Sequence, residues 1–245
     1  MDCGVSRHCE EPKATRQSSC QSGLLRYARN DVKKFLPLFL ALSACNVVHS
    51  SAGMLPEWNR DWHQVATQSD RNRLRDWRKS FTDALGAANK AGHSAEIARE
   101  GRLLDPDAAL SGGPIPNGTY SCRVIKVGAK QAGMLDYVGY PPFVCRIEQE
   151  RDLQGFAKLS GSQRPVGLIF PADPMRQVFL GTLVLGDERE ARQYGQDQTR
   201  DVAGYVEKIG PNRWRLVMPK PAFESQLDVM ELVPVAAPPL GGVRG

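Results

Sequence analysis

Two polar segments carry the residues whose types and spacing could do chemistry. The first is the run Ser160-Gly161-Ser162-Gln163-Arg164-Pro165, in which turn amides and a guanidinium could together hold an anion. The alternative is a tight hairpin in which Arg164 forms a structural salt bridge. Ser162 is not in a nucleophile elbow, because the run lacks the second glycine of Gly-x-Ser-x-Gly. We take Ser162, Gln163 and Arg164 as candidate binding residues.

The second segment joins two long apolar runs and concentrates carboxylates beside an arginine. Paired carboxylates with an arginine could bind a cation, act as acid and base, or contact a basic partner. The alternative is a solvated loop held by arginine–carboxylate pairs. The candidate binding residues of this segment are Asp187, Glu188, Tyr194, Asp197, Arg200 and Asp201.

Other signatures of catalysis are missing from the sequence. The histidines after residue 44 are His49, His63 and His93, and all of them precede the predicted strands. A histidine-dependent triad or a metal centre among the strands is therefore not expected. No Walker or dinucleotide fingerprint occurs. The sequence predicts no cofactor, no metal and no catalytic residue, and it favours a protein that is not an enzyme.

The charge balance argues against nucleic acid as a partner. The 245 residues carry a formal net charge of +5, but residues 45–245 hold 25 Lys or Arg against 23 Asp or Glu. A nucleic-acid binder usually concentrates basic residues on one surface. With 41% apolar and 24% charged residues, the chain has the composition of an ordinary globular protein of one or two domains.

An apolar run after two lysines predicts an exported protein with a lipid anchor. About ten apolar residues follow Lys34, and a helix of this length spans about 15 Å, half of a bilayer core. The run therefore resembles a signal-peptide core. It ends in Leu42-Ser43-Ala44-Cys45, which resembles a bacterial lipobox with Cys45 as the lipidated residue. A plain secretory peptide cleaved nearby, for example after Ala52, is the alternative. Asn46, rather than Asp, after the cysteine favours the periplasmic side of the outer membrane.

The leader also divides the residues around it into segments. Residues 1–31 contain three cysteines and are longer than an ordinary n-region, so we interpret them as a disordered extension from a start codon assigned too early. A genuine cytoplasmic extension is the alternative. Residues 32–44 are the predicted signal peptide, residues 45–57 a lipidated tether, and residues 236–245 a flexible tail.

Cys122 and Cys145 are the two cysteines that remain after Cys45. One pair in an exported protein predicts a disulfide, which here would join neighbouring strands around a hairpin centred at Gly133 and Met134. On the chain-entropy model, closing a loop of this length is worth roughly 3 kcal/mol. No Cys-x-x-Cys occurs, so a zinc or redox site is not expected.

Residues 58–112 read as a helical segment. Apolar residues recur there at spacings of three and four, which predicts one apolar stripe along a helix. Ser69 is the predicted N-cap of this helix, Gly92 its stop, and Ser94 the cap of a shorter second helix. The stripe consists of Leu74, Trp77, Phe81, Leu85 and Ala88.

Residues 113–235 read as short strands separated by turn residues. No helix-length segment interrupts them, which predicts an antiparallel meander closed into a small β-barrel or curved into a sheet. The fold class is therefore α+β, with the helical segment packed on roughly eight strands. The predicted strands are 119–127, 143–148, 156–159, 166–170, 177–185, 202–209, 214–218 and 227–233.

Several runs of the chain resemble a family of uncharacterised proteobacterial envelope proteins, a domain of unknown function. The resemblance covers about residues 58–234 and implies location and domain extent, but no activity and no catalytic residues. The runs that carry it are residues 103–108, Tyr120-Ser121-Cys122-Arg123, residues 161–165, residues 179–188, Trp214-Arg215-Leu216 and residues 224–232.

Three functions from different classes remain open. The first is a lipid-anchored, periplasm-facing module that binds a small ligand inside the barrel or at its mouth. The second is a structural or inhibitory module that contacts another envelope protein. The third, favoured least, is a hydrolase that uses the loop carboxylates. A barrel filled with large side chains would favour the second function, whereas a cavity of several hundred Å³ would favour the first.

Overall fold

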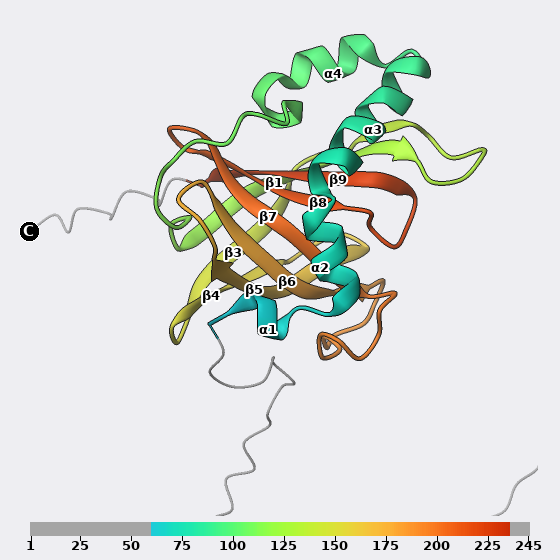
Figure 1. Cartoon of the computed structure of the whole chain (residues 1–245). Coiled ribbons are helices and arrows are strands. Elements are labelled where there is room, and N and C mark those ends of the chain that lie inside the picture. The colour runs from blue at the N-terminus through green and yellow to red at the C-terminus, as the bar shows by residue number, and fades with distance from the viewer. Residues whose placement is uncertain (1–59, 236–245) are drawn as a thin grey trace, which may run out of the picture. The chain divides into compact units, whose positions relative to one another are not determined.

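The structure, a computed structural model, describes residues 60–235 (Figure 1). The predicted extension, leader, tether and tail lie outside the described residues, and so does Cys45. The helices are α1 (Trp62–Val65), α2 (Gln68–Arg75), α3 (Trp77–Lys90), α4 (Ser94–Glu100) and a 3₁₀ turn (Gly101–Leu104). The strands are β1 (Gly118–Ala129), β2 (Tyr137–Gly139), β3 (Phe143–Glu150), β4 (Leu153–Lys158), β5 (Gln163–Pro171), β6 (Arg176–Leu185), β7 (Asp201–Gly210), β8 (Arg213–Pro219) and β9 (Ser225–Pro234).

Eight of these strands form a closed antiparallel barrel, which confirms the predicted α+β fold. Strands β3 to β8 each pair with the next strand in the chain, and β1 pairs with both β3 and β9. The β1–β9 ladder closes the barrel and runs from Tyr120 opposite Pro234 to Ala129 opposite Ser225. Strand β2 is an additional short strand on β1, where β1 extends beyond β3. The sequence did not predict β2.

The interior of the barrel is filled with large apolar side chains. Residues two apart along a strand face the same side of a sheet, so each strand sends alternate side chains inward. Phe156 and Phe179 meet edge to face near the middle, and Tyr120 and Trp214 do so toward one end. Glycines permit this close packing at positions such as Gly167, where a Cβ atom would overlap the carbonyl oxygen of Leu180 on the neighbouring strand.

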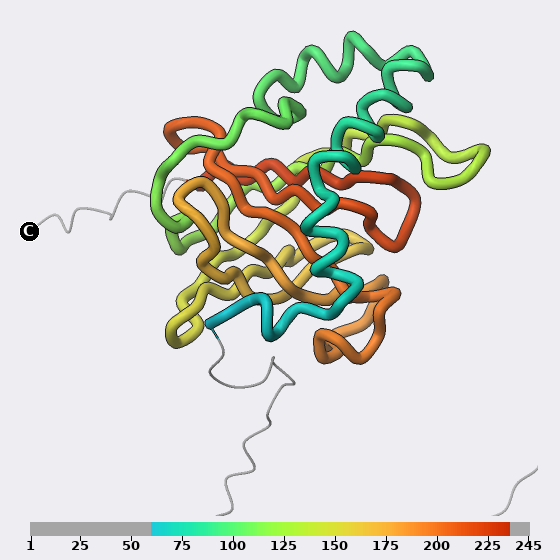
Figure 2. Tube along the Cα trace, viewed as in Figure 1, coloured from blue at the N-terminus to red at the C-terminus, as the bar shows by residue number. Residues whose placement is uncertain are grey.

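The helical segment crosses one face of the barrel (Figure 2). Helix α2 packs on β7, and α3 packs on β1, β8 and β9. The apolar stripe supplies the contact, since Leu74, Phe81 and Ala88 are fully buried. Arg215 on β8 ties the layers together, because its guanidinium pairs with Glu207 of β7 and also donates to the carbonyl of Leu103.

The helical segment differs from the prediction at the caps of its helices. Ser94 is the first residue of α4 and not its cap, since the N-cap position is occupied by His93. Thr67, not Ser69, is the N-cap, and its hydroxyl accepts a hydrogen bond from the Asp70 amide at 3.1 Å. The predicted single helix is divided at Asp76, whose φ of −90° and ψ of 9° interrupt the helical backbone between α2 and α3. Gly92 follows α3 with a φ of 98°, which suits a glycine at a helix end.

The predicted disulfide is present between Cys122 of β1 and Cys145 of β3, with the Cα atoms 5.9 Å apart. The two strands are neighbours, as expected, but the cysteines lie diagonally across the ladder. Cys145 is opposite Tyr120, and Cys122 is opposite Phe143. The hairpin is therefore centred one residue earlier than predicted, between Ala132 and Gly133. Among the residues that the structure describes, no helix is long and apolar enough to cross a membrane.

Candidate functional site

Both polar segments singled out in the sequence lie at the same end of the barrel. Strands of an antiparallel meander alternate in direction, so every second connection is found at one end. The β1–β3, β4–β5, β6–β7 and β8–β9 connections meet at this end, which we call the open end. The opposite end is covered by the strand-free run 111–117, in which Ile115 is 1% exposed and packs with the barrel interior.

A cavity of about 100 Å³ enters the barrel at the open end, and we call it the mouth pocket. An engineered cavity of about 150 Å³ holds one benzene molecule, so the mouth pocket has room for a group of about four heavy atoms. Its lining is Val124, Lys126, Tyr140, Phe143, Lys158, Ser162, Gln163, Pro165, Leu183, Met218, Glu224, Asp228 and Met230.

Lys126 reaches the pocket from β1 and forms a buried ion pair. Its Nζ atom lies 2.9 Å from Asp228 Oδ2 of β9, and both residues are 7% exposed. The Ser225 hydroxyl donates to the other oxygen of Asp228. Burial alone would lower the pKa of Lys126, but the charges of Asp228 and Glu224 outweigh it and raise that pKa. Lys126 is therefore a permanent cation in the pocket wall.

Lys158 enters the pocket from β4 and has no carboxylate partner among the residues that the structure describes. It is 5% exposed, and its Nζ atom donates to the carbonyl oxygens of Ser160 at 2.7 Å and Gln163 at 3.0 Å. The ammonium also lies 3.6 Å from the centre of the Phe143 ring. Burial, together with the charges of Arg164 and Lys126, lowers the pKa of Lys158 to about 8. Within residues 60–235, the partners of this buried cation are thus all neutral.

Glu224 separates the mouth pocket from a second cavity of about 240 Å³, which we call the side cavity. Its carboxylate lies 3.2 Å from Lys126 Nζ and accepts from the Gln163 amide at 3.4 Å. Gln163 and Glu224 line both cavities. The other residues of the side cavity are Lys130, Gln131, Met134, Leu185, Ala222 and Phe223.

Two of the three predicted residues of the first polar segment reach the mouth pocket, and the third does not. Ser162 and Gln163 line the mouth pocket. Arg164 points outward and donates to the carbonyl oxygens of Gly161 at 2.8 Å, Gly186 at 2.7 Å and Glu188 at 2.6 Å. Its guanidinium therefore joins the β4–β5 turn to the β6–β7 connection, and these contacts make it a structural link.

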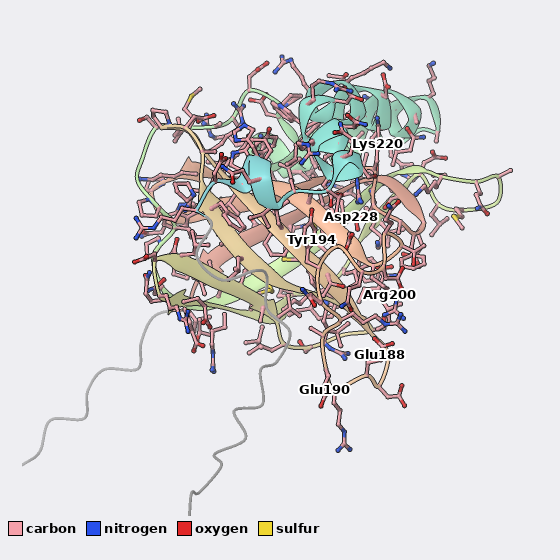
Figure 3. All side chains as sticks on the ribbon, turned by 60° about the horizontal axis from the view of Figure 1, so that its bottom comes forward. Glu188, Glu190, Tyr194, Arg200, Lys220 and Asp228 are labelled. Carbon is pink, nitrogen blue, oxygen red and sulfur yellow. A yellow bond between two sulfur atoms is a disulfide. The ribbon has the colours of Figure 1, made fainter. Side chains whose placement is uncertain are left out.

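Two carboxylates of the β6–β7 connection, Glu188 and Asp197, are held by local partners (Glu188 and Arg200 are labelled in Figure 3). Glu188 receives two hydrogen bonds from Arg200, at 2.8 and 3.0 Å, and one from the Leu185 amide. The hydrogen bonds from Arg200 and Leu185 lower the pKa of Glu188 to about 2. Asp197 accepts from Thr199, and Asp187 is exposed.

Tyr194 and Asp201 fasten the same connection to the helical segment. The Tyr194 hydroxyl donates to Asp70 of α2 and accepts from the Thr67 amide at 3.1 Å. Asp201 is 2% exposed and accepts from the Gly195 amide at 2.9 Å. Arg73 of α2 pairs with Asp70 at 2.8 Å and donates to the Asp201 carbonyl at 3.0 Å. This buried network positions α2 against the barrel.

Sequence reasoning missed the four charged residues that line the mouth pocket: Lys126, Lys158, Glu224 and Asp228. The signal that could have found the three that lie on strands is strand alternation. Tyr120, Cys122 and Val124 share the inward face of β1, and Lys126 is the next residue on that face. A lysine on an inward strand position is unusual enough to mark a site.

Two other hollows have charged residues in their walls, but these residues are exposed or half-buried. A groove of about 150 Å³ lies along β3 to β6 and is floored by small residues such as Gly155 and Ala157. A cleft of about 510 Å³ lies beside the run 110–114 at the covered end. Of these three hollows, the mouth pocket is the one whose wall contains buried lysines.

Comparison with known proteins adds a family but no activity. A family model described as "Domain of unknown function (DUF4893)" matches residues 62–232, which extend from α1 into β9. No curated protein matches the chain, and no solved structure matches it.

Proposed function

The chain belongs to the DUF4893 family, a domain of unknown function, and we propose that it binds a small anionic ligand at the open end of its barrel. The observation that carries this proposal is Lys158. A buried ammonium without a counter-ion costs several kcal/mol, and natural proteins seldom keep one without a use. A ligand carboxylate or phosphate in the mouth pocket would supply the missing counter-ion. The pocket volume fits such a group.

Thermal unfolding of the full chain tests the proposal. Sodium acetate and sodium phosphate are compared with sodium chloride at equal ionic strength. A ligand at ten times its Kd stabilises the folded state by about 1.4 kcal/mol, which raises the Tm of a domain of this size by about 3–6 °C. We expect this rise for wild type and its loss in Lys158→Met.

Lys220→Met is the matched control for this test. Lys220 lies at the same end of the barrel, but its ammonium pairs with Asp76 of the helical segment at 3.2 Å (Figure 3). The control removes the same charge without touching the mouth pocket, so its response to acetate should equal that of wild type. Equal Tm values in all three salts, or an unchanged response in Lys158→Met, would overturn the proposal.

We also propose that the protein is anchored by a lipid on Cys45 and faces the periplasm. The lipobox-like run before Cys45 supports this location. The Cys122–Cys145 disulfide also supports it, because disulfides persist in oxidising compartments. Mass spectrometry of the processed protein tests the anchor. A mature chain that begins after Ala52 and carries no lipid would refute it.

A second candidate function is contact with another envelope protein, and it is favoured by the filled barrel interior. Exposed apolar side chains also surround the open end. Met134 and Leu135 lie in the β1–β2 hairpin, where Leu135 is 69% exposed. Val144 of β3 and Leu159, which directly follows β4, lie side by side. A photo-crosslinker at position 135 should then capture one envelope protein in cells, and crosslinking should fall when Leu159 is replaced by Ser.

The hydrolase hypothesis receives the least support from the geometry. Glu188 and Asp197 are engaged by Arg200, Arg192 and Thr199, and Asp201 is buried against the helical segment. A general acid or base needs access to a substrate within hydrogen-bond reach. The arrangement of these carboxylates is that of structural ion pairs and loop caps.

A further inference from the structure

The mouth pocket and the side cavity form one divided site at the open end. Gln163 and Glu224 line both cavities, so the Glu224 side chain stands between them. The mouth pocket presents buried charges, whereas the wall of the side cavity includes the apolar groups of Met134, Leu185 and Phe223. A ligand that occupied both would need an anionic end and an apolar end.

Of the two carboxylates that pair with Lys126, Glu224 is the one that a ligand carboxylate could replace. Asp228 already provides Lys126 with a buried counter-ion at 2.9 Å, and the Ser225 hydroxyl fixes that carboxylate. Glu224 is the second carboxylate, at 3.2 Å, and its side chain is 47% exposed. A half-exposed ion pair is screened by solvent and contributes little, so it can be replaced at small cost.

The buried charges of the mouth pocket select a single negative charge on the ligand. With Glu224 moved aside, Lys126 and Lys158 face one fixed carboxylate there, that of Asp228. Lys130 lines the side cavity, but it is exposed and its ammonium donates to the carbonyl oxygens of Pro221 and Ala222. The buried balance is therefore one positive charge in excess, which one anionic group neutralises. A dianion would leave one negative charge uncompensated in a partly buried place.

We infer that the ligand is a monoanionic amphiphile, a carboxylate with a short apolar chain. Its carboxylate displaces Glu224 from Lys126 and neutralises Lys158, and its chain lies in the side cavity. Glu224 is then a specificity-determining residue, since its own carboxylate occupies the ligand position when the site is empty. This inference rests on the proposed function and adds the ligand class and the competing residue.

Chain length provides the first test. Isothermal titration of the full chain is carried out with acetate, butanoate, hexanoate and octanoate. Full burial of one methylene raises affinity about fourfold and half burial about twofold. The side cavity, at about 240 Å³, has room for on the order of eight to ten heavy atoms. Affinity should therefore rise at least twofold per methylene through hexanoate and level off beyond octanoate.

The side cavity itself is tested with a pair of neighbouring residues. Met134 lines the side cavity and is 38% exposed, so Met134→Ala should fold normally and lower the affinity for hexanoate about threefold to tenfold. Its affinity for acetate should be unchanged. Leu135→Ala is the matched control, because Leu135 is more exposed and does not line the cavity.

The competing role of Glu224 is tested by Glu224→Gln against Glu190→Gln. Glu190 is exposed on the β6–β7 connection, so its replacement changes net charge equally at the same end of the barrel (Figure 3). If the Glu224–Lys126 ion pair closes the site in most molecules, only the remaining, open molecules can bind the ligand. Removing the ion pair then raises the apparent affinity by the inverse of that open fraction. Glu224→Gln should bind hexanoate threefold to tenfold more tightly, and Glu190→Gln should match wild type within twofold.

The outcomes separate this inference from the proposed function. Acetate binding that depends on Lys158 but shows neither a chain-length effect nor a Glu224 effect would overturn the inference and leave the proposed function intact. The absence of binding for every probe, in wild type and in Glu224→Gln, would overturn both. Tighter binding of phosphate than of hexanoate would overturn the inference of an amphiphilic ligand and would still support an anion site.

Discussion

Replacing Lys158 with Met should make the folded protein more stable at neutral pH. The wild-type ammonium is 5% exposed and has two carbonyl oxygens and a ring as partners, and no carboxylate in the described part of the chain pairs with it. Methionine has a similar length and flexibility and needs no hydration. The substitution therefore removes a desolvation cost, while it also removes two hydrogen bonds.

The magnitude follows from the pKa of Lys158. Its environment lowers that pKa from 10.5 to about 8. At about 1.4 kcal/mol per unit, the folded environment disfavours the ammonium by roughly 3 kcal/mol. The two hydrogen bonds to carbonyl oxygens return about 0.5–1.5 kcal/mol each when they are intact. Lys158→Met should accordingly raise the free energy of unfolding at pH 7 by about 1–2 kcal/mol.

The gain should shrink as the pH rises. Between about pH 8 and about pH 10.4, Lys158 is neutral in the folded protein and still protonated in the unfolded chain. The unfolded state then binds more protons, so wild-type stability gains with pH from this group. The variant lacks the group, and its advantage over wild type should be largely lost at pH 10.

Urea denaturation of wild type and Lys158→Met at pH 7 and pH 10 measures both effects. Other titrating groups, including the tyrosines, are common to the two proteins and cancel in the difference. A variant that is less stable than wild type at pH 7 would show that Lys158 is a structural residue. An advantage that does not change with pH would show that the ammonium is not destabilised by its surroundings.

Three further substitutions test the structural contacts. Cys145→Ala should lower the free energy of unfolding by about 3 kcal/mol, because the bond to Cys122 closes a loop of 23 residues, and reduction of wild type should reproduce the loss in denaturant titrations. Tyr194→Phe should cost about 1–3 kcal/mol and speed amide exchange in α2, because the buried Asp70 loses one of its two hydroxyl donors and keeps only that of Thr67. Arg164→Ala should lower stability by about 1–3 kcal/mol, since three carbonyl oxygens lose their donor, and should leave the affinity for acetate within twofold of wild type.

The strands were predictable because their signal is local. Alternation with a period of two and turn residues between the runs identified all eight strands of the barrel. The disulfide was predictable because two cysteines in one hairpin leave a single pairing. The apolar stripe of the helical segment was also predicted correctly, but the residue that caps its start was not. Ser69 and Thr67 are both suitable caps by residue type. Thr67 is the one whose hydroxyl accepts from the amide three residues later, and its own amide donates to the Tyr194 hydroxyl, a contact across 127 residues of chain.

The candidate site was predictable only in part. Polar loop residues led to Ser162 and Gln163, which do line the mouth pocket. The same reasoning selected Arg164, because a guanidinium beside turn amides is compatible with an anion site or with a structural link. Its three carbonyl partners come from the β4–β5 turn and the β6–β7 connection, and only the folded barrel brings them together.

Alternation along a strand follows from the amino-acid order, and it puts Lys126 on the same face of β1 as Tyr120. Which inward residues meet depends on the folded barrel. The pairing of β1 with β9 places Lys126 opposite Asp228, although 102 residues separate them in the chain. The curvature of the barrel then brings Lys158 and Glu224 to the same mouth. A local pattern fixes the direction of a side chain, whereas its neighbours across the barrel depend on closure and register.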